Sequence, residues 1–213
     1  MMRTGAARRV GAEETGTALI CALTVTMLLS ILGGALVMLL TTERVIGSHH
    51  RAAQDALYAA DAGLERAAGL LRGVADWNTV LVSACEGPAA ALCDRASPRK
   101  AGDGTRLDLL ALTTENQAES AARYGDRGPV WSLMTYAPLD RLLSVAPIPA
   151  PPYVIVWVGD DADDPDGDPM RDTNGVLVVR AEGFGASGAR RAVEVIVARE
   201  RSGVRLVNWR EVR

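Results

Sequence analysis

The residues best suited to ligand chemistry are six aspartates within nine residues, from Asp160 to Asp168. Carboxylate oxygens are ligands that Ca²⁺ prefers, and about six to eight oxygens surround each ion. The spacing does not fit an EF-hand, since a glycine at its sixth position would put Ala162 first. Two interpretations stay open: a solvated loop of mutually repelling carboxylates, or a calcium site, which is the one cofactor that the sequence suggests. The candidate ligands of that site are Asp161, Asp164, Asp166 and Asp168.

Other residues with catalytic potential lack the neighbours that catalysis needs. The only histidines, His49 and His50, are adjacent, and no second pair stands at the spacing of a metal site. Gly183 to Gly188 reads G-x-G-x-x-G after an expected strand, but residues of alternating polarity follow it instead of the helix that a dinucleotide site requires. We interpret the segment as a hairpin turn and expect no enzymatic activity.

The composition is that of a globular chain without an electrostatic footprint for nucleic acid. Hydrophobic residues make up 48% of the chain and the net charge is -3, which excludes disorder along its whole length. No block of Lys and Arg interleaved with aromatic residues occurs, so nucleic acid is not an expected partner. With about 150 residues per domain as a guide, the chain is expected to form one domain with an appendage, or two small modules.

A helix able to cross a membrane is expected near the N-terminus. Thr15 to Thr42 carries no charged residue, and Thr17 to Leu40 exceeds the roughly 20 apolar residues that cross about 30 Å of hydrocarbon. The run is longer than the apolar part of a secretory signal peptide, which has about 7–15 residues. Basic residues precede it, so the positive-inside rule predicts a cytoplasmic N-terminus and an extracytoplasmic remainder.

Helical periodicity continues beyond this span, from Glu43 to Arg72. Apolar residues recur there at steps of three and four and form one stripe, with charged residues between them. The stripe consists of Val45, Ile46, Ala53, Ala56, Leu57, Ala60, Leu64, Ala67, Ala68 and Leu71. We expect this face to pack against a sheet formed by the rest of the chain.

Several segments in the first third of the chain have a recognisable order and spacing. They are Gly16–Leu23, Leu28–Gly33, Glu43-Arg44 and Ala52–Glu65, the last of which contains Ala59-Ala60-Asp61-Ala62-Gly63-Leu64-Glu65. Together they resemble the N-terminal region of PilX-type minor pilins, over residues 14–72. The resemblance implies an assembly, initiation or tip component of a type IV pilus, anchored in a bacterial inner membrane with its C-terminal domain in the periplasm.

The resemblance also assigns roles to particular residues. A prepilin peptidase would remove a leader, residues 1–16, by cutting after Gly16 and leaving Thr17 as the new amino terminus. Residues 17–42 would then be the transmembrane half of the helix and residues 43–73 its amphipathic half. Other pilins are the implied partners, through this helix.

Three residues in the span bear on filament packing. Ordinary pilins carry a glutamate at the fifth mature position, where this chain has Cys21. Gly33 and Gly34 would either loosen the helix, since glycine weakens a helix by about 1 kcal/mol relative to alanine, or allow close packing against a neighbouring helix. Two rival interpretations remain: a type II secretion pseudopilin, and a single-span calcium-binding or adhesive module outside any filament.

Beyond the helix, the sequence predicts an α+β domain of the pilin-like kind. Residues 74–152 are mixed, with a helix expected over 107–123, and the proline-rich residues 147–152 are expected to be a stiff connector at a boundary. Residues 153–213 are expected to form an antiparallel meander with strands at 153–158, 176–182 and 192–199.

The expected oxidation state of each cysteine depends on its location relative to the membrane. Cys85 and Cys93 lie on the oxidising side of the membrane in the predicted topology, where a disulfide between them would close a short loop. Cys21 lies inside the predicted span and is expected to stay free.

Overall fold

The computed structural model describes residues 12–82, 85, 87–201 and 203–212. Most of the leader expected at residues 1–16 therefore lies outside the described residues. The chain divides into two compact units, Met1–Ser48 and His49–Arg213. Each unit is considered by itself below.

The first unit consists of the N-terminal part of helix α1, whose full bounds are Ala12–Arg72. Every side chain from Gly16 to Ser48 is exposed, although the segment is rich in Leu, Ile, Val and Met. Its hydroxyl groups bond back to the helix: Thr24 Oγ1 donates to Ile20 O at 3.0 Å, and Thr41 Oγ1 donates to Val37 O at 3.0 Å. Such internal hydrogen bonds suit a surface that meets hydrocarbon. This helix is long and apolar enough to span a membrane.

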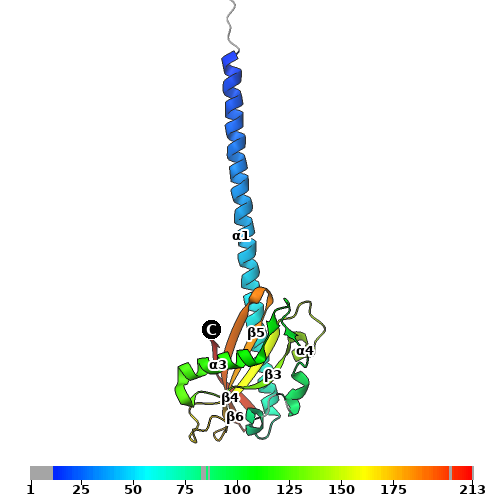
Figure 1. Cartoon of the computed structure of the whole chain (residues 1–213), viewed down its shortest axis with the longest axis vertical. Coiled ribbons are helices and arrows are strands. Elements are labelled where there is room, and N and C mark those ends of the chain that lie inside the picture. Colours follow the sequence, from blue (N-terminus) through cyan, green and yellow to red (C-terminus); the bar gives the residue numbers. More distant parts are fainter. Residues whose placement is uncertain (1–11, 83–84, 86, 202, 213) are drawn as a thin grey trace, which may run out of the picture. The chain divides into compact units, whose positions relative to one another are not determined.

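The second unit is built on a five-stranded antiparallel sheet in the order β3-β4-β5-β6-β7 (Figure 1). Its strands are β3 Ser132–Pro138, β4 Tyr153–Asp160, β5 Val176–Phe184, β6 Arg190–Glu200 and β7 Gly203–Val212. The three predicted strands are confirmed as the centre of this sheet. The outer strands β3 and β7 were not predicted. The α+β class is confirmed.

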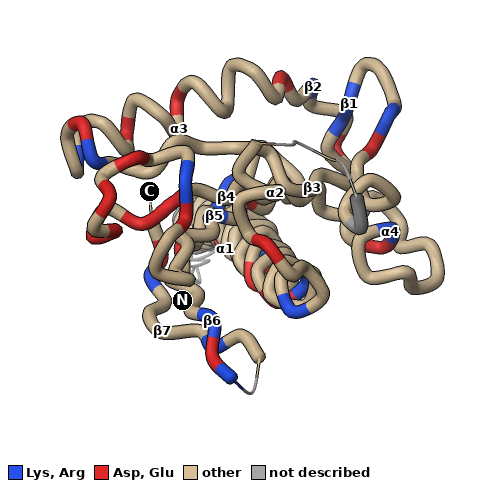
Figure 2. The backbone as a smooth tube through the Cα atoms, turned by 90° about the horizontal axis from the view of Figure 1, so that it is seen from below, with Lys and Arg blue, Asp and Glu red and all other residues tan. Residues whose placement is uncertain are grey.

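The sheet is covered on both faces, which explains the continuous apolar sequence of its central strand. All eight residues of β4 are buried. Val154, Val156 and Val158 pack in a core with the C-terminal part of α1, whereas Tyr153, Ile155 and Trp157, on the opposite face, pack with residues of α3, Leu109–Tyr124. Figure 2 shows the strands between α3 and the end of α1. A strand buried on both faces has no polar face, so its sequence does not alternate.

The predicted apolar stripe of α1 is confirmed from Ala56 onward. Its small residues contact the sheet together with Leu64 and Leu71, which are almost completely buried. Val45 and Ile46, by contrast, are 55% and 63% exposed. These two residues belong to the first unit and continue its exposed apolar surface, so their place in the sheet-packing stripe was predicted wrongly.

The expected boundary at residues 147–152 does not separate two modules. Strands β3 and β4 lie on either side of it in sequence and pair directly, with Tyr136 opposite Ile155. Leu139 N also donates to Pro152 O at 2.8 Å. The proline-rich segment is therefore a connection inside one sheet, and proline suits it because no ladder hydrogen bond is needed there.

Smaller elements complete the second unit. They are α2 Asn78–Val82, η1 Gly87–Leu92, β1 Arg99–Lys100, β2 Arg106–Leu107, η2 Gly125–Arg127, α4 Leu139–Leu143 and η3 Ala186–Gly188. The helix expected over residues 107–123 is confirmed as α3, and Asp108 caps it by accepting hydrogen bonds from the N–H groups of Leu110 and Ala111. This cap fixes where the helix begins.

The predicted disulfide joins Cys85 to Cys93. Cys93 is buried and forms an isolated parallel bridge with Tyr136 of β3, where Asp94 N donates to Tyr136 O at 2.7 Å. The disulfide therefore ties the segment after α2 to the outer strand of the sheet. Cys21 is a free, exposed cysteine in α1.

Candidate metal centre

The acidic run lies at the end of β4 and in the loop that leads to β5. Asp160 is the last residue of β4, and Asp161 and Asp164 follow in the loop. Gly167 and Gly175 adopt φ angles of 65° and 75°, a left-handed conformation that glycine tolerates best. The loop therefore turns sharply and returns its chain beside Asp164.

Most of the aspartates in this run stabilise the turns of their own loop. Each of four aspartates accepts a hydrogen bond from the backbone N–H two residues further on, the pattern of an Asx-turn. The four acceptors are Asp161, Asp164, Asp166 and Asp168, with distances of 3.1, 3.2, 3.0 and 3.1 Å. These are the four residues that the sequence suggested as calcium ligands, so local turn formation explains much of the density of aspartates.

Asp164 also closes the base of the loop. Its Oδ2 accepts hydrogen bonds from the N–H groups of Thr173 at 2.8 Å and Asn174 at 3.2 Å, and its Oδ1 accepts one from the Thr173 hydroxyl. Burial of Asp164 acts to raise the pKa of its carboxyl, but the hydrogen bonds outweigh burial and lower that pKa to about 2. Asp164 is therefore an ionised, firmly held carboxylate.

Asp160 has the opposite environment. Its exposed fraction is 2%, and its Oδ1 is buried without a hydrogen-bond partner. Burial raises the pKa of this carboxyl to about 7, and the negative charges of Asp164 and Asp161 add to the increase. A buried oxygen without a partner is unfavourable unless a proton or a cation satisfies it.

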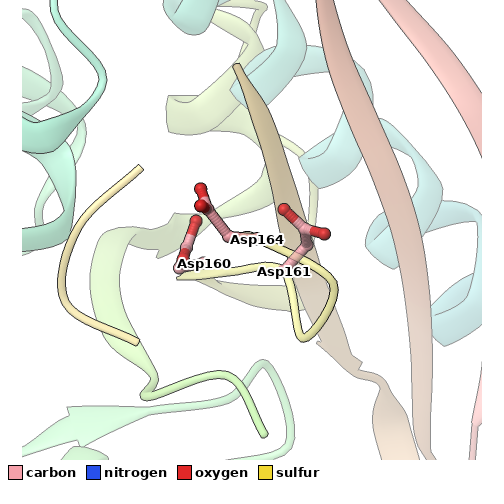
Figure 3. Close-up of side chains that lie close together, drawn as sticks. All are labelled: Asp160, Asp161 and Asp164. Atoms are coloured by element: carbon pink, nitrogen blue, oxygen red, sulfur yellow. The ribbon is translucent and has the colours of Figure 1, made fainter. Parts of the chain in front are cut away.

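Three of the carboxylates converge. Asp160, Asp161 and Asp164 each offer an oxygen, and these three oxygens lie within 4.8 Å of one another. Figure 3 shows the side chains of Asp160 and Asp164 directed toward each other, with Asp161 beside them. The described residues Asp166 and Asp168 do not belong to this group; Asp166 Oδ2 instead lies 3.8 Å from Arg171 Nε.

Two members of the group, Asp161 and Asp164, were among the predicted ligands, and Asp160 was not. The sequence could have indicated Asp160, because it follows the buried residues Val156 and Val158 at the two-residue spacing of a strand. A carboxylate at the next inward position of a buried strand is expected to be buried as well.

The other candidate residues lie in α1. Gly16, Gly33 and Gly34 have no atom within 4 Å of the position that a Cβ would occupy. The helix is continuous through Gly33 and Gly34, so no contact with another described residue requires glycine at those positions. Gly16 and Thr17 lie in the helix, immediately before the apolar run.

The glycine motif at Gly183 to Gly188 belongs to the hairpin between β5 and β6, as predicted. Gly183 lies in β5, and Gly185 N donates to Ala189 O at 2.8 Å across the turn. No helix of the dinucleotide-binding kind follows it.

These features define the class of the protein as an α+β domain whose chain also contains a helix long and apolar enough to span a membrane. No family model, curated protein or solved structure matches the chain. Its function is therefore inferred from its own residues and geometry.

Proposed function

We propose that the chain is a minor pilin, anchored in the inner membrane of a bacterium by the N-terminal part of α1, with its α+β domain in the periplasm. In this role it would assist assembly of a type IV pilus, as part of the initiating complex or the tip. Its work is helix packing and display of a domain, not catalysis.

The observation that carries the proposal is the two-part character of α1. From Gly16 to Ser48 the helix exposes apolar side chains throughout, and from Ala52 to Leu71 the same helix buries one face against an antiparallel sheet. A soluble protein rarely exposes a continuous apolar surface of this length. A subunit that inserts one part of a helix in a membrane and later among other helices needs such a surface.

The glycines of the span support the same interpretation. Each glycine costs a helix about 1 kcal/mol relative to alanine, and in the described part of the chain no contact requires Gly33 or Gly34. Glycine pairs in apolar helices allow other helices to approach closely. Close contact with the helices of neighbouring pilins would explain why glycine occurs at these two positions.

The proposed pilin role is tested by whether a prepilin peptidase removes the leader. When the full-length chain is produced together with a prepilin peptidase, mass spectrometry of membrane-extracted protein should find Thr17 at the amino terminus. Gly16→Leu should leave the protein uncut, because the peptidase requires a small residue before the cleaved bond. The substitution should leave the fold intact, since no atom lies near that position.

Gly69→Leu is the matched control. Gly69 is also an exposed glycine of α1 with open space beside it, so this variant should be cut like the wild type. An uncut wild-type chain in a cell that assembles pili would contradict the proposal. Deleting the gene should lower the number of surface pili; loss of enzyme secretion with normal piliation would indicate a secretion pseudopilin instead.

A further inference from the structure

Asp160 is the aspartate that the turns of the acidic loop do not explain. The four aspartates that accept N–H groups two residues ahead each have a structural role. Asp160 Oδ1 is buried without a partner, and Asp160 forms the converging group with Asp161 and Asp164. Three neighbouring carboxylates repel one another unless something positive lies between them.

The spacing of the three oxygens matches one ion. Two ligands on opposite sides of a Ca²⁺ ion, each about 2.4 Å away, are about 4.8 Å apart, and the three oxygens lie within 4.8 Å of one another. Mg²⁺ demands a near-ideal octahedron, usually keeps several waters and is bound through one or two carboxylates, whereas Ca²⁺ accepts more protein oxygens in flexible geometry. Three carboxylates at the end of a strand and in its loop therefore suit calcium better than magnesium.

Among the residues that the structure describes, no ion pair places a positive group between these carboxylates. Arg127 lines the same cleft as Asp160 and Asp161, yet among the described residues no ion pair joins it to the three carboxylates. Arg171 approaches Asp166, outside the group. The cleft has a cavity volume of about 10 Å³, which is enough for one water-sized sphere and hence for a calcium ion.

We propose that Ca²⁺ binds at the end of β4, coordinated by Asp160, Asp161 and Asp164. Asp160 contributes its unpaired oxygen from a rigid strand. Asp164 stays in place through the backbone N–H groups that donate to its Oδ2. The Thr173 hydroxyl donates to Oδ1 and would rotate its proton away when Oδ1 binds the ion. Water and loop oxygens complete the coordination shell.

Calcium binding would join the end of β4 to the point where the loop returns toward β5. Asp160 and Asp161 lie on the outgoing side, and Asp164 holds Thr173 and Asn174 on the returning side. The ion therefore stabilises the loop in one conformation. This inference is independent of the proposed pilus role.

Thermal unfolding and calorimetric titration of the full-length protein in a non-ionic detergent test the proposal. Calcium at about 100 times its Kd should raise the Tm by about 5–10 °C, and sodium at equal ionic strength should not. Magnesium should give a smaller rise. Asp160→Asn should weaken calcium binding by on the order of tenfold or more, because it removes one of three ligand charges.

Asp163→Asn is the matched control, because Asp163 is an exposed aspartate of the same loop outside the group. It should keep the full calcium response, although it removes the same charge. In a calcium chelator, Asp160→Asn should be at least as stable as the wild type, because it no longer buries an uncompensated carboxylate. The proposal is overturned if calcium leaves the wild-type Tm unchanged, if both variants lose calcium binding equally, or if Asp160→Asn unfolds earlier in chelator.

Discussion

Gly183 of β5 packs so closely against α1 that a Cβ at position 183 would lie 1.9 Å from the carbonyl oxygen of Ala56. Two further glycines mark the same contact: a Cβ on Gly185 would lie 2.7 Å from Ala52 O, and one on Gly63 would lie 2.6 Å from Val154 Cγ1. Gly63 of α1 and the two glycines at the end of β5 are thus explained by the same contact, in which a larger residue would not fit. Helix and sheet approach each other here at backbone distance.

Gly183→Ala should therefore destabilise the protein strongly. The added methyl group meets backbone rather than a movable side chain, so helix and strand must separate, at a cost of about 3 kcal/mol in the free energy of unfolding. Urea unfolding of the full-length protein in detergent measures the change.

Gly69→Ala is the control for this prediction. It lies in the same helix with open space around it, and alanine there should stabilise the protein by up to about 1 kcal/mol. Changes of equal sign and size in the two variants would show that helix propensity, not the contact with Ala56, decides the outcome.

Much of the fold was predictable because strong hydrophobic patterns specify it. The apolar stripe of α1 from Ala56 to Leu71 and the inner strands β4, β5 and β6 all face a core, and burial fixes both their pattern and their position. The outer strand β7 was missed because Leu206, Val207 and Trp209 are 38%, 47% and 50% exposed, so no inward and outward alternation marks it. β3 is short and ends at Pro138, a residue that argues against a strand.

The candidate site was only half predictable, for a different reason. Sequence shows that carboxylates are abundant between residues 160 and 168, but their directions depend on turns that form through hydrogen bonds. Asp166 and Asp168 point into their own Asx-turns, whereas Asp160 is directed by the pleat of β4. The directions of these side chains, which the sequence alone does not show, therefore decide which carboxylates converge.

A buried ionic network joins α3 to the face of the sheet that α3 covers. Arg180 of β5 is 2% exposed and lies 2.9 Å from Glu119 of α3, 3.0 Å from Glu182 and 2.9 Å from Glu194. Glu182 is fully buried and Glu194 is 5% exposed. Removing Arg180 takes one positive partner away from each of the three glutamates.

Arg180→Met should therefore lower the free energy of unfolding by about 3–5 kcal/mol, the cost of breaking a buried ion pair from one side. Arg191→Met is the matched control. Arg191 is partly exposed and lies 3.4 Å from Glu211, a surface pair worth about 0–1 kcal/mol. Arg190 also pairs with Glu182, at 2.8 Å, and Arg210 pairs with Glu194. A loss below about 1 kcal/mol for Arg180→Met would mean that these two arginines compensate.

The last prediction concerns Cys21 and depends on the proposed pilus role. Cys21 is neutral, free and exposed on α1, and it occupies the fifth position after Gly16. A carboxylate within the hydrocarbon costs about 2.5–3.5 kcal/mol unless it is paired. In ordinary pilins, the glutamate at this position gains such a pair from the amino terminus of a neighbouring subunit. A neutral residue has no such requirement, so under the proposed role this subunit would be stable where that neighbour is absent, at the filament tip.

Cys21→Glu should then move the protein away from the tip, because the new carboxylate is stabilised only beside another subunit. Immunogold labelling of sheared pili should find wild-type protein at one end of each filament and the variant along the shaft, with a changed number of pili per cell. Cys21→Ser keeps the residue small and neutral and should behave like the wild type. Wild-type label spread evenly along the shaft, or an unchanged distribution for Cys21→Glu, would contradict the link between this side chain and the tip.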